Sequence, residues 1–194
     1  MTATVFIDGE AGTTGLQIHT RLANRKDVEL LRLDNSERKD PQRRKAMLNN
    51  ADLSILCLPD GAAREAVSMI ENPEARVVDA STAHRVADDW VYGMAEYDAE
   101  QMTRIATARR VSNPGCYPVA TIALVHPLVE VGLLPENWSL TINAVSGYSG
   151  GGKGLIAAFE NETADCHTTD CLQVYGLTLE HKHAPEIHKY SGLK

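Results

Sequence analysis

Cys116 has the sequence surroundings of a nucleophile. It follows a Pro-Gly turn in residues 112–118 (SNPGCYP) and precedes an apolar run over residues 119–125. The pattern predicts a helix that begins at this cysteine. Unpaired backbone N–H groups and the positive end of the helix dipole favour an anion at such a position, so they activate a thiol and can also receive an oxyanion. The alternative is a small buried hydrophobe, the ordinary role of a free cysteine.

A histidine-rich segment supplies a partner for this thiol. Residues 181–188 read HKHAPEIH, and Pro185 suits the first turn of a helix. Histidine exchanges protons near neutral pH, so a Cys–His pair is a reasonable catalytic arrangement. We take His181 as the general acid or base and His183 as the second candidate. The alternative is a solvated surface patch of histidines.

The N-terminus has the order strand, glycine turn, helix. Residues 4–7 (TVFI) are apolar, residues 8–15 read DGEAGTTG, and apolar residues then recur at helical spacing. Glycines at such a turn let the backbone approach a diphosphate, which binds the N–H groups at the helix start. The spacing is GxxGxxG, not GxGxxG, but its context is that of a dinucleotide site. The predicted cofactor-binding residues are Gly9, Gly12, Thr13, Thr14 and Gly15.

The next predicted strand indicates which dinucleotide binds. It ends at Asp34, 19 residues after the last of these glycines, where an acid often holds the ribose 2′-hydroxyl of NAD. Ser36, Arg38 and Lys39 follow at once, and a hydroxyl with two cations suits a 2′-phosphate. We therefore predict NADP(H). The alternative is a solvated charged loop before the next helix.

The remaining pattern alternates strands with helices. Strands are predicted near residues 52–58 and 75–79, with a helix after Pro59, and a further strand is predicted over residues 139–145. Such alternation predicts an α/β fold with a parallel sheet covered by helices.

A glycine-rich loop follows the last predicted strand. Residues 146–154 offer clustered N–H donors together with hydroxyls and a lysine, which suit an anionic ligand. A flexible connector is the alternative. Residues 165–171 (DCHTTDC) hold two thiols and an imidazole, but no second ligand pair accompanies them, so we predict a polar loop and no metal.

Composition narrows the class of protein. The chain has 194 residues, 43% of them hydrophobic, and a net charge of −7. No basic stripe with interleaved aromatics is present, which argues against nucleic acid, and residues 43–45 (RRK) are expected on a surface helix. No apolar run is long enough for a membrane, no secretory leader is recognisable, and four cysteines make no disulfide framework. We expect a cytoplasmic enzyme without membrane or nucleic-acid partners.

Taken together, these motifs closely resemble the N-acetyl-gamma-glutamyl-phosphate reductase family, in its short, type 2 subfamily, which is related to the aspartate-semialdehyde dehydrogenases. The resemblance rests on the glycine turn at 9–15, the cysteine segment at 112–118 and the histidine segment at 181–187. Residues 79–85 and 92–96 also look like family landmarks. The resemblance spans essentially the whole chain.

The resemblance implies two domains and an association state. Residues 1–112 are expected to form a Rossmann-like NAD(P)-binding domain, and residues 113–194 part of an α+β catalytic and dimerisation domain of the semialdehyde dehydrogenase type. A homo-oligomer is expected for the full-length protein. The family pattern has threonine where this chain has Val119, and family members continue well past residue 194. We therefore expect a C-terminally truncated chain that is marginally stable or prone to aggregation.

The resemblance also implies a reaction. Cys116 would attack N-acetylglutamyl 5-phosphate, expel phosphate and form a thioester, which NADPH would reduce to N-acetylglutamate 5-semialdehyde, an intermediate of arginine biosynthesis. His181 would move the proton. Two alternatives remain open: reduction of another acyl phosphate, and a nucleotide-binding fragment without turnover. The predicted contacts to the anionic substrate are Arg85, Asn113, Ser149, Lys153 and His183.

Overall fold

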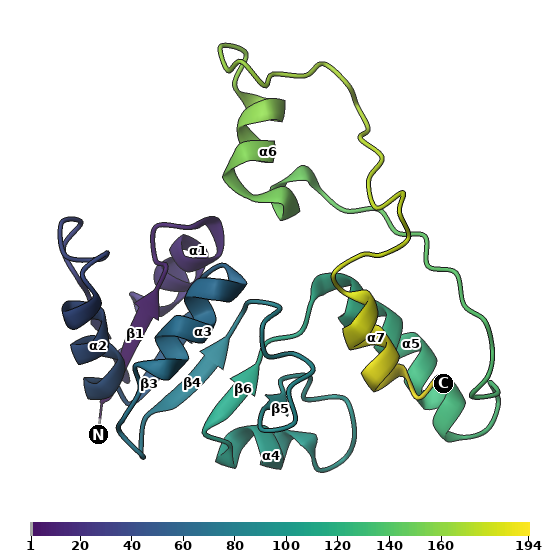
Figure 1. Ribbon diagram of the computed structural model, residues 1–194, viewed down its shortest axis with the longest axis horizontal. Helices are drawn as coiled ribbons and strands as arrows, with labels where there is room; N and C mark the ends of the chain where they lie inside the picture. Colours follow the sequence, from purple (N-terminus) through teal and green to yellow (C-terminus); the bar gives the residue numbers. More distant parts are fainter. Residues whose placement is uncertain (1) are drawn as a thin grey trace.

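The computed structural model describes residues 2–194 and has a six-stranded parallel sheet in its N-terminal part (Figure 1). The strands are β1 (Ala3–Asp8), β2 (Val28–Leu31), β3 (Leu53–Leu56), β4 (Arg76–Asp79), β5 (Val91–Tyr92) and β6 (Arg110–Ser112). The helices are α1 (Thr13–Leu22), α2 (Pro41–Asn50), α3 (Asp60–Ser68), α4 (Gln101–Thr107), α5 (Cys116–Glu130), α6 (Gly152–Glu160) and α7 (Ala184–Ser191), with a 3₁₀ turn, η1 (Tyr148–Gly151), before α6. The predicted α/β fold is confirmed.

The strand order places the functional loops at one edge of the sheet. The order is β2-β1-β3-β4-β6-β5, so β2 lies on one side of β1 and the later strands lie on the other. In such sheets ligands bind beyond the carboxyl ends of the strands, where the order reverses. Asp8, Leu56, Asp79 and Ser112 stand in one register row across β1, β3, β4 and β6. The segments that follow these four residues therefore meet along one edge.

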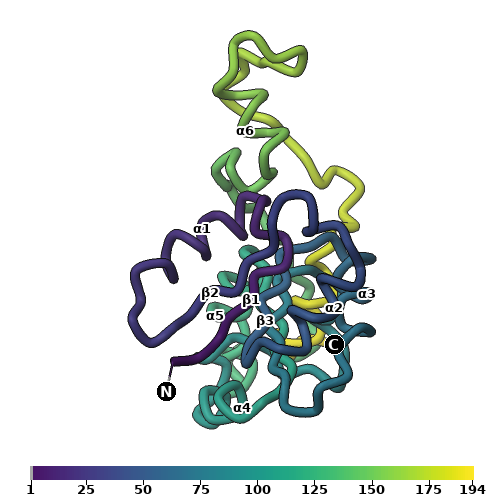
Figure 2. Tube along the Cα trace, turned by 90° about the vertical axis from the view of Figure 1, so that its left-hand side faces the viewer, coloured from purple at the N-terminus to yellow at the C-terminus, as the bar shows by residue number. Residues whose placement is uncertain are grey.

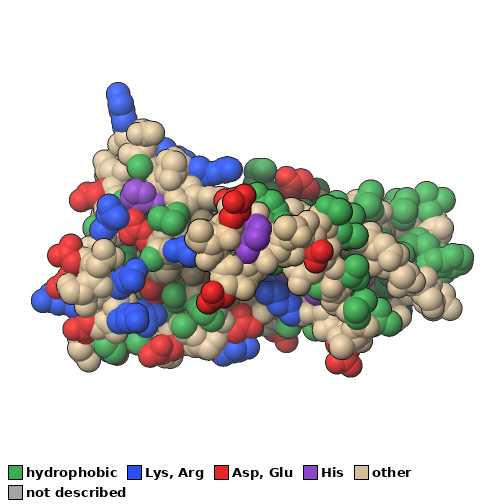
Figure 3. Space-filling view, turned by 90° about the horizontal axis from the view of Figure 1, so that it is seen from above, with side chains coloured by type: hydrophobic (Ala, Val, Ile, Leu, Met, Phe, Trp, Pro, Cys, Tyr) green, Lys and Arg blue, Asp and Glu red, His purple; other side chains and the backbone are tan. Residues whose placement is uncertain are grey.

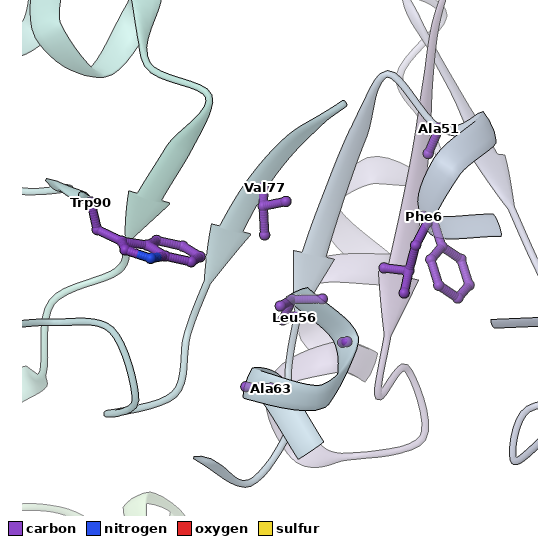
Figure 4. Packing of buried hydrophobic residues seen from close by; sticks show 8 residues of the cluster. Phe6, Ala51, Leu56, Ala63, Val77 and Trp90 are labelled. Carbon is purple, nitrogen blue, oxygen red and sulfur yellow. The ribbon is translucent and has the colours of Figure 1, made fainter. Parts of the chain in front are cut away.

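The main core lies between the sheet and its helices. Phe6, Leu56 and Val77 are buried on neighbouring strands, and Trp90 extends the cluster beyond β4 (Figure 4). On α3 the inward residues are alanines, and Ala63 is fully buried. Small side chains let this helix approach the sheet closely, which fixes the segment that follows β3.

The sequence suggested that the basic run 43–45 lies on the surface of a helix, but part of this run is buried. Helix α2 is capped by Asp40, whose carboxylate accepts hydrogen bonds from two first-turn N–H groups. Arg44 then points inward and forms an ion pair with Asp8 at the end of β1, at 2.9 Å. Both side chains are buried, so Arg44 supplies the partner that a buried carboxylate at the end of a central strand requires.

The C-terminal part is helical and extended. Helices α5 and α7 pack side by side, whereas α6 projects away from the sheet, as Figures 1 and 2 show. The strand predicted over residues 139–145 is not formed. All of its residues are exposed, and within residues 2–194 no segment pairs with it, so its backbone lacks the ladder that a strand requires.

Hydrophobic side chains gather at one end of the molecule. Figure 3 shows them on the right, the side on which α5 and the coil after it lie in Figure 1. Many of the exposed large hydrophobic residues belong to α5 and to the two long connections around α6, and the largest exposed fractions are those of Val145, Leu177 and Leu179. Exposed apolar patches of this kind occur at interaction surfaces and in chains that are prone to aggregation. Over residues 2–194, no helix combines the length and the apolar character needed to span a bilayer.

Candidate active site

Helix α5 begins at Cys116, as the sequence predicted, and leaves backbone donors beside the thiol. Its N-cap is Gly115, which provides no side-chain cap, and Cys116 is exposed. The N–H of Gly115 is already used, because it donates to Oε1 of Glu186 at 2.8 Å. Pro118 has no N–H. The first-turn donors that remain are those of Cys116 and Tyr117, next to the sulfur.

Gly115 allows three functional side chains to meet at this turn. A Cβ on Gly115 would lie 2.6 Å from Nη1 of Arg85, 2.9 Å from Nε2 of His183 and 3.0 Å from Oε2 of Glu186. Real Cβ atoms almost never show contacts under 3.0 Å, so a side chain at position 115 would displace Arg85 and His183. The same contacts place His183 directly against the residue that precedes Cys116.

The two candidate histidines lie together. The ring centroids of His181 and His183 are 4.7 Å apart, and the backbone N–H of His183 donates to Nδ1 of His181 at 3.2 Å. The ring of Tyr117, the neighbour of Cys116, lies 5.6 Å from that of His181. The structure therefore gathers the cysteine turn and both histidines at the start of α5 and just before α7.

His183 is neutral near pH 7. It is 7% exposed, and burial lowers the pKa of its imidazole to about 4, with a further contribution from the positive charges of Arg85, His181 and Lys182. Its Nδ1 is buried, and no atom of residues 2–194 forms a hydrogen bond with it. A neutral buried imidazole can accept a proton or a hydrogen bond, but it holds no ionisable proton to donate at that pH.

Arg85, predicted to contact the substrate, is engaged within the protein. Its guanidinium donates to the carbonyls of Asn113 and Ala80 at 3.0 and 3.1 Å, and to the carboxylate of Glu186 at 3.1 Å. The ion pair is buried on both sides. These contacts tie the loop after β4 to the nucleophile turn. Asn113 itself is exposed, and its side-chain amide donates to the carbonyl of Pro114. A substrate contact by either residue stays a prediction.

The glycine turn fits a dinucleotide. Gly9 has φ +91°, and a Cβ there would lie 2.3 Å from the carbonyl oxygen of Cys57. A Cβ on Gly15 would lie 2.4 Å from the carbonyl oxygen of Gly9, so the turn and α1 are in close backbone contact. The N-cap Gly12 supplies no side-chain cap, which leaves the N–H groups of Thr13 and Thr14 to a ligand. Such a helix start receives phosphate oxygens.

The residues proposed for the 2′-phosphate lie in the loop that follows β2. Ser36, Arg38 and Lys39 are all exposed there. Arg32, which precedes them, forms an ion pair with Glu10 of the glycine turn at 2.8 Å. This pair ties the loop to the turn.

The two candidates from the glycine-rich loop do not meet at Cys116. Ser149 lies in η1 and is exposed. Lys153 lies in the first turn of α6, and its ammonium donates to the carbonyl of Ala11 in the glycine turn. The loop instead reaches the cysteine through Ser146, whose hydroxyl accepts a hydrogen bond from that of Tyr117 at 2.8 Å. Residues 2–194 contain no cluster of three metal-ligating side chains.

Sequence reasoning missed Glu186, Tyr92 and Tyr117. The carboxylate of Glu186 accepts from the hydroxyl of Tyr92 at 2.8 Å as well as from Gly115 and Arg85. Glu186 stands within the histidine segment, so its position was a usable signal. Nothing in one sequence pairs residue 92 with residue 186, because only the fold brings β5 against α7.

Comparison with known proteins identifies the family. The family model described as "Semialdehyde dehydrogenase, NAD binding domain" matches residues 4–105, which is more than half of the chain. The chain belongs to the semialdehyde dehydrogenase family. A second model, described as "Semialdehyde dehydrogenase, dimerisation domain", matches residues 116–194. The first match covers the glycine turn and the second begins at Cys116 itself.

Two curated relatives of this member of the semialdehyde dehydrogenase family carry the same enzyme name. It is 58% identical over 192 residues to N-acetyl-gamma-glutamyl-phosphate reductase 2 of Pseudomonas putida, covering 99% of this chain and 61% of that protein. It is also 58% identical to the N-acetyl-gamma-glutamyl-phosphate reductase of Burkholderia cenocepacia, covering 98% of this chain and 60% of that protein. The chain thus spans about three fifths of the length of these curated relatives.

A solved structure shares the fold. Aspartate semialdehyde dehydrogenase II of Vibrio cholerae matches with a TM-score of 0.60 at 16% identity, covering 100% of this chain and 67% of that one. At this identity the likeness concerns the fold alone.

Proposed function

We propose that this chain carries the catalytic cysteine and the dinucleotide site of an N-acetyl-gamma-glutamyl-phosphate reductase, which reduces N-acetylglutamyl 5-phosphate to the 5-semialdehyde and phosphate in arginine biosynthesis. The observation that carries the proposal is the exposed Cys116 at the start of α5, whose neighbours Gly115 and Tyr117 lie against His183 and near His181. The names of the relatives support the substrate.

The covalent step uses the chain's own groups. The Cys116 thiolate attacks the acyl carbon, and the developing oxyanion accepts hydrogen bonds from the N–H groups at the start of α5. The bond from that carbon to the phosphate oxygen then breaks. Inorganic phosphate leaves, and an acyl thioester remains on Cys116. His181 takes the thiol proton before the attack and returns a proton when the product forms.

The proposed cofactor is NADP(H). Gly9, Gly12 and Gly15 let it approach the backbone, Thr13 and Thr14 offer N–H groups to its diphosphate, and Ser36, Arg38 and Lys39 face its 2′-phosphate. When bound, it supplies the hydride that reduces the thioester. The role of the chain is to hold it across the sheet edge from Cys116.

The remaining roles are proposed with the same reaction. We propose that Asn113 and His183, at the cysteine turn, contact the substrate. Arg85 would contact its anionic groups from the ion pair with Glu186, and Ser149 and Lys153 would do so from the side of the glycine turn. The division between the dinucleotide-binding domain and the catalytic domain lies between residues 112 and 113, a place that falls between the two family matches. The proposed enzyme acts in the cytoplasm. It forms a homo-oligomer, and the match to a dimerisation domain supports this association.

The test is an assay of the reverse reaction on the 194-residue chain. NADPH formation is followed with NADP, N-acetylglutamate 5-semialdehyde and phosphate, beside Cys116→Ser. Formation that requires both phosphate and Cys116 supports the proposal, and aspartate semialdehyde as the better substrate would redirect it to another acyl phosphate. Binding of NADP without any turnover would favour a nucleotide-binding fragment.

A further inference from the structure

Glu186 binds the turn that presents Cys116. Its Oε1 accepts from the N–H of Gly115 at 2.8 Å and from the hydroxyl of Tyr92 at 2.8 Å, while its Oε2 accepts from Arg85 at 3.1 Å. Both oxygens act as acceptors, so the group is an ionised carboxylate. It is 2% exposed, and it joins α7 to the residue that caps the nucleophile helix.

This carboxylate lies at the backbone N–H of Gly115, the residue next to the thiol-bearing Cys116. Arg85, Tyr92 and Tyr190 face it, and His183 meets it at Gly115, while His181 and Lys182 precede it on the approach to α7. A buried carboxylate near a thiol opposes formation of the thiolate. The guanidinium of Arg85 offsets that charge, because it pairs with the other oxygen and is also buried.

We propose that Glu186 is a positioning residue for Cys116: it holds Gly115 in place and, paired with Arg85, presents a balanced charge to the thiol. The inference deepens the proposed function and rests on it, since it takes Cys116 as the nucleophile. Glutamate is required because an amide has only one accepting oxygen. A glutamine at position 186 satisfies either Gly115 and Tyr92 or Arg85, and it leaves the guanidinium charge uncompensated.

The charges of Glu186 and Arg85 predict the direction in which each substitution moves the pH at which the Cys116 thiolate forms. Glu186→Gln removes the negative member and keeps Arg85, so the Cys116 thiolate forms at lower pH. Arg85→Gln removes the positive member and keeps Glu186, so the thiolate forms at higher pH. Each shift is expected to be about one pH unit. A purely structural role for the pair would move neither midpoint in a direction set by charge.

The experiment measures the alkylation rate of Cys116 by iodoacetamide against pH in the 194-residue chain. Mass spectrometry of the peptide that contains Cys116 separates it from the other cysteines, and burial raises the pKa of Cys57 to about 11, which slows that thiol. Glu71→Gln is the matched control, because Glu71 is exposed and pairs with Lys45 at 2.6 Å. Its midpoint should equal that of the wild type. Circular dichroism checks that each variant is folded.

Shifts of opposite sign for Glu186→Gln and Arg85→Gln support the proposal. Equal midpoints, or shifts of the same sign, overturn it. If Glu186→Gln does not fold, Arg85→Gln decides alone, with an upward shift in support and no shift against. The alkylation needs no substrate or cofactor, so opposite shifts in a chain without reductase turnover would keep this inference while the proposed function failed.

Discussion

The backbone N–H of His183 donates a hydrogen bond to Nδ1 of His181 at 3.2 Å. An Nδ1 that accepts has no proton of its own, so neutral His181 carries its proton on Nε2. The ring of His181 therefore presents an N–H donor, at Nε2, on the side away from the backbone N–H of His183. His183 is buried and neutral at the same pH. We propose His181 as the group that exchanges protons: its Nε2–H can donate a proton to the forming product, and its Nδ1 takes the thiol proton only by giving up the hydrogen bond from His183.

Replacing His181 should lower turnover more than replacing His183. His181→Asn removes the proton carrier, and kcat should fall by about 100-fold or more, with little change in KM for NADP. His183→Asn keeps that carrier and should have the smaller effect on kcat. Steady-state kinetics of both variants checks this. A larger loss of kcat in His183→Asn would reverse the assignment.

His183 should make the fold sensitive to acid. Burial, with nearby positive charge, lowers its pKa from 6.5 to about 4 in the folded chain, so the unfolded chain binds more protons between those values. The free energy of unfolding should therefore fall as pH drops from about 6.5 to about 4, by on the order of 2 kcal/mol from this group. Urea unfolding at several pH values measures it. In His183→Gln the slope over that window should be shallower, and an unchanged slope would contradict the assignment.

Gly9 should tolerate no side chain. Gly9→Ala places a Cβ 2.3 Å from a backbone carbonyl at a φ of +91°, so we expect a loss of about 2 kcal/mol or more and weaker NADP binding. Gly61→Ala is the matched control, because a Cβ there meets nothing within 4 Å and alanine favours a helix. Thermal unfolding and NADP titration of both variants test this. Equal stability of the two variants would count against the close approach at Gly9.

Arg44 should contribute strongly to stability. Arg44→Met leaves the buried carboxylate of Asp8 without its partner, and breaking a buried pair in this way costs about 3–5 kcal/mol. Arg43→Met changes an exposed neighbour that pairs with Glu37 at 3.4 Å, and it should cost less than about 1 kcal/mol. Denaturant unfolding compares them. Similar losses in the two variants would mean that the buried pair adds little.

Local signals predicted most of the elements around the site. The glycine turn and the Pro-Gly-Cys turn mark where α1 and α5 begin, because turn residues and helix starts are encoded locally. The strand predicted over residues 139–145 failed because alternation describes a side-chain pattern, whereas a strand needs a neighbour to pair with.

The sequence pattern could not predict contacts between segments that are distant in the chain. Arg85 looked like a free anion contact, yet it meets Glu186 across 101 positions, and Arg44 looked like a surface cation, yet it meets Asp8 across 36. A charged side chain has the same appearance in a sequence whether it faces solvent or a buried partner. Only the packing of α2 and α7 decides which.

The acyl enzyme is the most direct test of Cys116 as the nucleophile. The 194-residue chain is incubated with N-acetylglutamyl 5-phosphate in the absence of NADPH, so that a thioester cannot be reduced, and the peptide that contains Cys116 is weighed by mass spectrometry. We predict an N-acetylglutamyl adduct on that peptide, together with released phosphate, and neither in Cys116→Ser. Phosphate release with no adduct on Cys116, or an unchanged adduct in the serine variant, would contradict the account.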